Sequence, residues 1–161
     1  MPRRTALPRD FDTAPMYSNG AAEQRLGGAM ASIAAADATA ALARITTKTG
    51  RLVRRAGAPL AAAAAPGAEL SAPEVESREL MPDYSGDGAG RSLAESLGRL
   101  GLPHVFSLRV HDCDGAGAPP SADNSDDVLA PGGHLAGLVA LRVAGHIKQV
   151  SLGMNAHTGF G

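Results

Sequence analysis

The stretch that decides the fold is AGRSLAESLGRLGLPHVFSLRVH, at residues 89–111. Its first half carries leucines at helical spacing, which lie on one face of a helix: Leu93, Leu97 and Leu100. Gly101 ends this helix, and Pro103 follows as a second stop signal. The largely apolar residues 105–111 then predict a strand. The stretch therefore predicts one helix–strand unit of an α/β protein.

The same alternation of strand and helix extends from this unit in both directions. Strands are expected at residues 10–13, 45–48 and 147–152, and helices at residues 21–36 and 133–144. Each connection is long enough for a right-handed crossover, so we expect about four parallel strands and three main helices. This order fits half of a (β/α)₈ barrel or a small doubly wound sheet, and periodicity does not choose between them. The doubly wound option is disfavoured because no G-x-G-x-x-G follows a strand.

Two stretches rich in helix breakers interrupt this pattern. Residues 50–84 contain several prolines and the alanine run 61–65, and we interpret them as one long loop, with or without a short helical piece. Residues 113–126, rich in Gly, Pro, Asp and Ser, predict a second loop. The whole chain, residues 1–161, is interpreted as a single domain.

Composition excludes several classes of protein. The 161-residue chain has a net charge of −1, which argues against a nucleic-acid partner. No run of about 18 apolar residues occurs, so no membrane span is expected. The basic start at residues 1–4 lacks the apolar segment of a secretory signal. The only cysteine, Cys113, excludes an internal disulfide and is typical of a reducing compartment, so we predict a cytoplasmic protein.

Four polar residues lie at or just beyond the carboxyl ends of the expected strands, where parallel α/β folds build active sites. They are Asp12, Tyr17, Lys48 and His111. A nearby ammonium makes a phenol more acidic, an aspartate holds that ammonium in place, and an imidazole donates a hydrogen bond to a carbonyl oxygen. Together they form a plausible proton-transfer set. Taken singly, each also has an ordinary interpretation as a cap, a loop aromatic, a solvated amine or a hydrogen-bonded histidine.

A metal or thiol site near residues 104–114 has weaker support. His104, His111, Cys113 and Asp114 lack the paired spacing of zinc ligands, so no metal is predicted. Cys113 could act as a nucleophile beside His111, but no oxyanion motif accompanies it.

Several ordered motifs resemble those of the aldo/keto reductases, in the branch of D-threo-aldose (L-fucose), L-galactose and pyridoxal dehydrogenases. They are FDTAPMY at 11–17, EQRLG at 23–27, ITTKTGRL at 45–52, DYS at 83–85, RSL at 91–93, SLGRLGL at 96–102, HD at 111–112 and GMN at 153–155. The resemblance covers roughly residues 10 to 155, and the order of the motifs makes it specific.

This resemblance implies a (β/α)₈ barrel and hydride transfer between NAD or NADP and the carbonyl or alcohol of a small, sugar-like substrate. Tyr17 would be the general acid–base, with Lys48 making the phenol more acidic and Asp12 pairing with Lys48. His111 would orient the substrate oxygen, and Asn155 falls where the family contacts the nicotinamide carboxamide. The cofactor would carry the hydride, and the protein would supply positioning and protons.

The resemblance also implies a partial barrel, truncated at both ends. A complete barrel needs about 250 residues. The first strand of the family and everything after its fifth strand are missing, including its main contacts with the cofactor phosphates. We therefore expect a fragment with impaired activity, whose open sheet edges allow self-association. The alternative is a catalytically silent scaffold or interaction protein.

Two charged residues fall on positions that should face the barrel interior. Asp10 shares a strand face with Asp12, and Arg109 shares one with His111. Because an unpaired buried arginine is costly, we predict an ion pair between Asp10 and Arg109.

Overall fold

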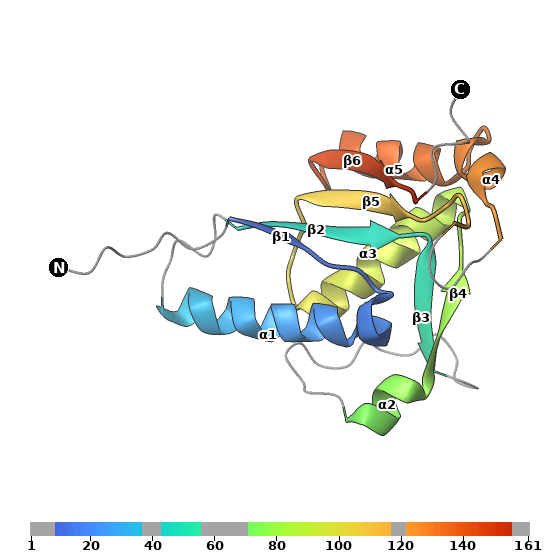
Figure 1. Cartoon of the computed structure of the whole chain (residues 1–161). Coiled ribbons are helices and arrows are strands. Elements are labelled where there is room, and N and C mark those ends of the chain that lie inside the picture. Colours follow the sequence, from blue (N-terminus) through green and yellow to red (C-terminus); the bar gives the residue numbers. More distant parts are fainter. Residues whose placement is uncertain (1–8, 37–42, 56–70, 117–121, 156–161) are drawn as a thin grey trace.

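The computed structural model describes residues 9–36, 43–55, 71–116 and 122–155. Four strands form one parallel sheet in the order β1-β2-β5-β6 (Figure 1). They are β1 (Asp10–Asp12), β2 (Arg44–Thr49), β5 (Ser107–His111) and β6 (Gln149–Gly153). This arrangement confirms the predicted part of a parallel α/β barrel.

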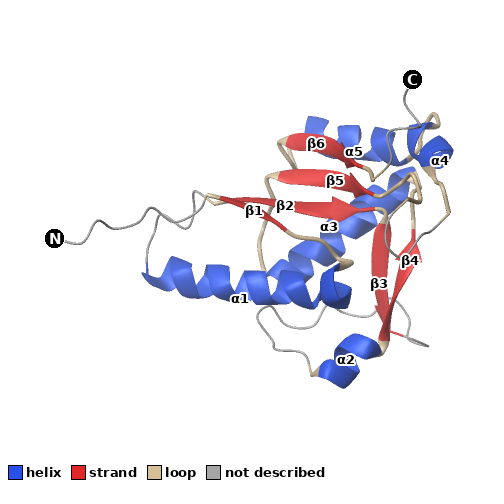
Figure 2. Cartoon of the chain, in the orientation of Figure 1, coloured by secondary structure: helices blue, strands red, loops and turns tan. Residues whose placement is uncertain are grey.

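Three long helices pack against one face of this sheet (Figure 2). They are α1 (Ala21–Ala36), α3 (Gly86–Leu100) and α5 (His134–Val143). The remaining helical elements are short: the 3₁₀ turn η1 (Tyr17–Gly20), α2 (Ala72–Glu76) and α4 (Ser125–Leu129). Among the described residues, no helix has the length and apolar character needed to cross a membrane.

The boundaries of α3 follow from local capping. The Ser85 hydroxyl accepts a hydrogen bond from the backbone N–H of Gly88 at 3.1 Å, which places the start of the helix at Gly86, three residues before the stretch quoted above. Gly101 adopts a left-handed conformation, with φ of 65°, and its N–H donates to Leu97. A left-handed residue at this position is the common end of a helix, and glycine adopts it without steric cost.

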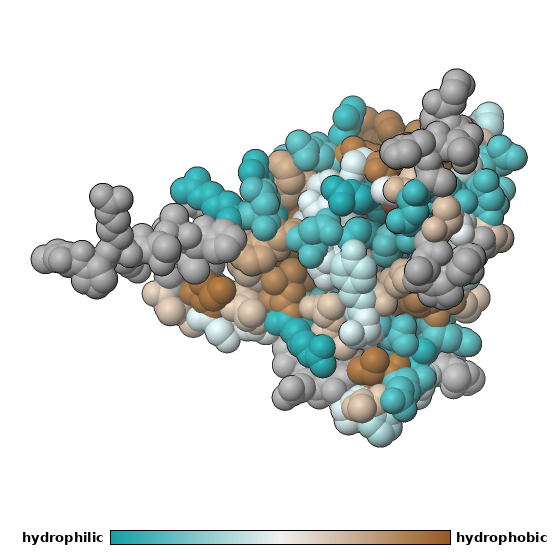
Figure 3. Space-filling view, viewed as in Figure 1, coloured by the Kyte–Doolittle hydropathy of each residue, from teal (hydrophilic) through white to brown (hydrophobic). Residues whose placement is uncertain are grey.

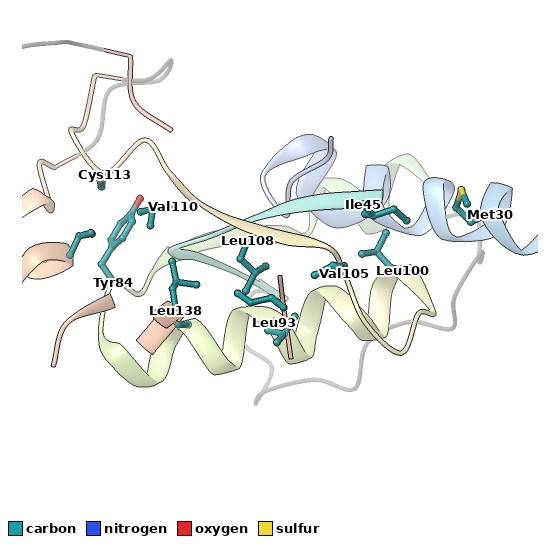
Figure 4. Close-up of a cluster of buried hydrophobic side chains, with 13 residues drawn as sticks. Met30, Ile45, Tyr84, Leu93, Leu100, Val105, Leu108, Val110, Cys113 and Leu138 are labelled. Atoms are coloured by element: carbon teal, nitrogen blue, oxygen red, sulfur yellow. The ribbon is translucent and has the colours of Figure 1, made fainter. Parts of the chain in front are cut away.

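The core lies between the sheet and the helices and is almost entirely aliphatic. Leu108 and Val110 of β5 are fully buried, and Figure 4 shows Leu108 close to Leu93 and Leu138 of the helices. Tyr84 is the aromatic member of this cluster, and its hydroxyl donates to the backbone carbonyl of His111 at 2.6 Å. The aromatic ring therefore links the core to the end of β5.

The interpretation of residues 50–84 as a long loop needs correction, although α2 is the short helical piece that it allowed. This stretch contains the antiparallel hairpin of β3 (Arg51–Arg55) and β4 (Arg78–Pro82), together with α2. The strand-forming RLVRR at 51–55 stands directly before the Pro- and Ala-rich run, whose composition dominated the sequence interpretation. That run, residues 56–70, lies outside the described residues. Pro73 falls in the first turn of α2, where proline is tolerated.

Smaller boundary differences occur elsewhere. Helix α4 begins at Ser125, inside the predicted loop 113–126, and residues 117–121 lie outside the described part of the chain. Strand β5 begins at Ser107 rather than Val105, and β6 at Gln149 rather than Ile147.

Within the described ranges, the other face of the sheet carries no helix and is polar, and we call it the helix-free face. Its residues alternate along the strands with those of the core: Asp10, Asp12, Arg44, Thr46, Lys48, Ser107, Arg109, His111, Gln149 and Ser151. Figure 3 shows hydrophilic residues gathered over the middle of the sheet in the orientation of Figure 1.

The predicted ion pair between Asp10 and Arg109 is wrong. Asp10 lies opposite Arg44 in the register of β1 and β2, and this guanidinium binds its carboxylate at 2.7 and 2.8 Å. Arg109 reaches Asp12 instead, with 3.3 Å between Nη1 and Oδ1. The register explains the difference, because Arg109 is level with Lys48, which lies four residues beyond the level of Asp10.

Candidate active site

Lys48 is the centre of a polar cluster at the carboxyl edge of the sheet. Its side chain is only 6 % exposed, yet its Nζ has three oxygen acceptors. They are Asp12 Oδ2 at 2.6 Å, the Tyr17 hydroxyl at 2.9 Å and the Thr13 carbonyl at 3.1 Å. An ammonium has three N–H donors, so all of them are used. The buried charge is therefore fully hydrogen-bonded and fixed in position.

Tyr17 comes to Lys48 from the 3₁₀ turn that follows β1. Tyr17 is 42 % exposed, so its phenol is held by the ammonium and is also accessible to solvent. The Lys48 Nζ also lies 4.5 Å from the centre of the Tyr17 ring. The ammonium therefore contacts both the hydroxyl and the ring of Tyr17.

The turn that carries Tyr17 depends on Asn19, which sequence reasoning did not assign to the site. Asn19 has a positive φ of 48°, a conformation that asparagine adopts more readily than most residues. Its side-chain amide donates to the carbonyls of Val75 at 3.2 Å and Arg78 at 3.1 Å. The Arg78 guanidinium donates in return to the Asn19 carbonyl at 3.3 Å. These bonds attach the turn to α2 and to the start of β4.

His111 ends β5 and faces Tyr17 edge to face, with 5.9 Å between the ring centres. The pKa of this imidazole is lowered to about 4, chiefly by burial and also by the positive charges of Lys48 and Arg51, against the opposing effect of Asp112. The ring is thus neutral near pH 7, with one N–H donor and one acceptor nitrogen. Its buried Nδ1 has no hydrogen-bond partner among the described residues, and its Nε2 lies 3.5 Å from Asp112 Oδ2.

Two arginines add positive charge around this cluster. Arg51, at the start of β3, lies 3.8 Å from Asp112 and its Nη1 contacts the sulfur of Met16 at 2.6 Å. Arg109 contacts Asp12, as described above. Arg51 belongs to the ITTKTGRL motif quoted above, three residues after Lys48. Its place in that motif could have assigned it to the site from the sequence.

Asn155 lies just beyond the end of β6, at the same edge. Its backbone N–H donates to Asp114 Oδ2 at 2.9 Å, and the residue is exposed. Within the described part of the chain, no hydrogen bond joins its side chain to Asp12, Tyr17 or Lys48. The structure therefore brings the four candidate proton-transfer residues together and leaves Asn155 at the rim.

The candidate metal and thiol residues form no comparable centre. No group of three or more His, Cys, Asp or Glu side chains within the described ranges is arranged to hold a metal ion. Cys113 is buried, and burial together with the charge of Asp114 raises the pKa of its thiol. A buried thiol with a raised pKa is a poor nucleophile.

No protein-family model matches the chain. Among curated proteins, it is 42 % identical over 76 residues to the pyridoxal 4-dehydrogenase of Microbacterium luteolum. The match covers 45 % of this chain and 21 % of that protein.

Solved structures of similar fold match about nine-tenths of this chain. The glycerol dehydrogenase of Gluconobacter oxydans has a TM-score of 0.59 and 18 % identity, and the match spans 92 % of this chain and 35 % of that one. An aldo-keto reductase of Bombyx mori, solved with NADP, has a TM-score of 0.53 and 19 % identity, spanning 89 % and 35 %. An aldo-keto reductase of Bacillus halodurans, in its holo form, has a TM-score of 0.54 and 18 % identity, spanning 91 % and 36 %.

The comparisons confirm the resemblance to aldo/keto reductases and the partial-barrel fold. They also set its extent, because the chain spans about a fifth of the curated relative and about a third of these solved structures.

Proposed function

We propose that this chain carries the proton-transfer site of an aldo/keto reductase and interconverts a carbonyl and an alcohol with NAD or NADP. The observation that carries the proposal is the position of the Lys48 ammonium, which contacts the Tyr17 hydroxyl at 2.9 Å and Asp12 at 2.6 Å. This contact places a fixed positive charge where a phenol that gives up its proton to a substrate needs it.

Each member of the site has a distinct role in this proposal. In the reductive direction, the Tyr17 hydroxyl donates its proton to the substrate oxygen, and Lys48 stabilises the phenolate that remains. Asp12 holds Lys48 in position. His111, being neutral, orients the substrate oxygen by donating an N–H hydrogen bond.

The chemistry of these side chains fits a nicotinamide cofactor. The four side chains move protons and hold charge, and none of them is a redox group, so a separate hydride donor or acceptor is required. When bound, NAD or NADP supplies that hydride. The exposed amide of Asn155 at the same edge is our candidate for holding the nicotinamide carboxamide.

For the substrate, we propose a small sugar-like aldehyde or alcohol, as in the D-threo-aldose and L-galactose dehydrogenases. The support is the hydroxyl-bearing and charged helix-free face, which offers hydrogen bonds to a polyhydroxylated molecule. Pyridoxal, named in the curated relative, is a second substrate to test. The single buried cysteine fits a reducing compartment such as the cytoplasm. The sheet edges β1 and β6 are candidate sites of self-association.

The test is cofactor binding followed by turnover. We expect quenching of NADH or NADPH fluorescence on binding, and loss of cofactor absorbance with aldoses or pyridoxal. Tyr17→Phe and Lys48→Met should each lower kcat by about 100-fold or more while the circular dichroism spectrum stays unchanged. Lys148→Met is the matched control, because Lys148 is exposed at the opposite end of β6 and should leave kcat intact.

Two outcomes would contradict the proposal. Unchanged turnover in Tyr17→Phe would remove the phenol from the mechanism. Absence of cofactor binding at high micromolar concentration would favour a catalytically silent scaffold, an alternative consistent with a chain that spans about a third of the similar structures.

A further inference from the structure

Arg109 is out of place for the interior of a barrel. It lies on the helix-free face of β5, level with Lys48 on β2 and Ser151 on β6. Barrel interiors are dominated by bulky branched apolar side chains, and none of the three residues at this level is apolar. An arginine held there needs a reason beyond packing.

Its neighbours direct the guanidinium toward the candidate active site. Arg109 Nε donates to Ser151 Oγ at 3.2 Å, and Nη1 donates to Asp12 Oδ1 at 3.3 Å. The aliphatic stem occupies the space beside Gly153, where an added Cβ would lie 2.9 Å from Arg109 Cδ. Gly153 is opposite His111 in the register, so the stem runs toward the carboxyl edge of the sheet.

Part of the guanidinium is available for a ligand. Of its five N–H donors, the two bonds to Ser151 and Asp12 use one each, and Nη2 has no hydrogen-bond partner among the described residues. The side chain is 38 % exposed. Its donors therefore face accessible space rather than a closed core.

The local charge favours an anion. One oxygen of the Asp12 carboxylate binds Lys48 and the other binds Arg109, so a single negative charge is shared by two positive charges. The Asp10 carboxylate forms a bidentate ion pair with Arg44 and does not offset this excess of positive charge. A guanidinium matches the planar geometry of carboxylate and phosphate groups.

We propose that Arg109 binds an oxyanion, carboxylate or phosphate, carried by the substrate, and that it sets the substrate class of this site. This inference rests on the proposed function. Arg109 precedes His111 by two residues on one strand face, a separation of about 7 Å. The substrate is accordingly an oxo acid, sugar acid or sugar phosphate whose anion lies several bonds from the reacting carbonyl.

The test compares substrates that differ only in charge. The carboxylate arm uses succinic semialdehyde against butanal, and the phosphate arm uses glycolaldehyde phosphate against glycolaldehyde. We expect the anionic member of at least one pair to have a kcat/KM at least tenfold higher in the unmodified chain. Arg109→Leu should abolish this preference through KM, so that the charged and neutral members of the pair have equal kcat/KM.

Two variants control for structure and for the general field. Arg109→Gln keeps a polar side chain next to Gly153 and should lose the preference as Arg109→Leu does. Arg44→Leu removes a cation from the same helix-free face at a lower level of the sheet and should keep the preference. An equal loss in Arg44→Leu, or an unchanged preference in Arg109→Gln, would overturn the assignment to Arg109.

A binding measurement separates this inference from the proposed function. Calorimetric titration with γ-hydroxybutyrate against its amide requires neither cofactor nor turnover. Binding of the acid alone, lost in Arg109→Leu, would support the oxyanion site even if no turnover were found. Turnover with equal kcat/KM for charged and neutral substrates would support the proposed function and overturn the oxyanion site.

Discussion

The two faces of the parallel sheet are built from alternate residues of the same strands. On β5, Leu108 and Val110 are fully buried against the helices, whereas Arg109 between them faces the other way and is 38 % exposed on its side chain. One step along the strand therefore changes the surroundings from close-packed aliphatic side chains to charged and accessible ones. Packing free energy is concentrated on one face, and the candidate chemistry is concentrated on the other.

The same contrast applies to ion pairs. Between α1 and α3, the fully buried Glu23 carboxylate accepts from Arg99 Nε at 2.6 Å and from the Thr47 hydroxyl at 2.5 Å. On the helix-free face, Asp10 and Arg44 form a pair with equally good geometry but side-chain exposures of 68 % and 51 %. Geometry alone thus does not indicate how much a pair contributes to stability.

The largest effect expected from this contrast is at Glu23. Glu23→Ala leaves the Arg99 guanidinium buried without its main counter-charge, so the free energy of unfolding should fall by at least about 3 kcal/mol. Urea unfolding followed by circular dichroism measures this. Asp10→Ala, the matched change on the helix-free face, should leave the midpoint unchanged. Equal losses in both variants would break the comparison.

The next effect concerns neighbouring residues of β5. Leu108→Ala removes fully buried methyl groups and leaves a cavity, which should lower the free energy of unfolding by about 3 kcal/mol. Arg109→Ala, one residue further along, should cost less than about 1 kcal/mol because its ion pair is partly exposed. The same urea measurement gives both values. A larger loss at Arg109 would show that the helix-free face also carries the fold.

The smallest effect is the pH dependence from His111, the buried end of the helix-free face. Its folded pKa of about 4 lies below the ordinary 6.5, so the unfolded chain alone binds a proton between these values. Stability is therefore fully present above pH 6.5 and falls as the pH drops toward 4. Urea midpoints across this range should show a shallower slope in His111→Gln, with a residual slope from His134, whose pKa burial also lowers.

The exposed His104 provides the control, since His104→Gln should keep the slope of the unmodified chain. An equal slope of stability against pH in His111→Gln and in the unmodified chain would contradict the burial of His111. This end of the helix-free face would then be as accessible to solvent as the rest.

Much of the fold could be predicted because helix and strand patterns are local. Helix α1 begins and ends where the apolar spacing of residues 21–36 predicts, and Gly101 ends α3 as expected. The β3–β4 hairpin could not be predicted because its strands are separated by a run whose composition indicates a loop. A pairing between residues 51–55 and 78–82 is a long-range property that single-strand patterns do not carry.

The site shows the same division. The order of the motifs predicted which residues would meet, and Asp12, Tyr17, Lys48 and His111 do lie together. The partner of Arg109 could not be predicted, because alternation gives the face of a strand residue but not its level relative to the neighbouring strands. That level depends on register, which places Arg109 beside Lys48 and within reach of Asp12.

The bonds of Asn19 have a mechanical consequence. They join the turn that holds Tyr17 to the carbonyls of Val75 in α2 and of Arg78 at the start of β4 in the β3–β4 hairpin, 56 and 59 residues further along the chain. A molecule that tightens this hairpin also restricts the phenol, and a molecule that immobilises the phenol stiffens the hairpin by the same free energy. Two segments that are remote in the sequence are thereby mechanically coupled.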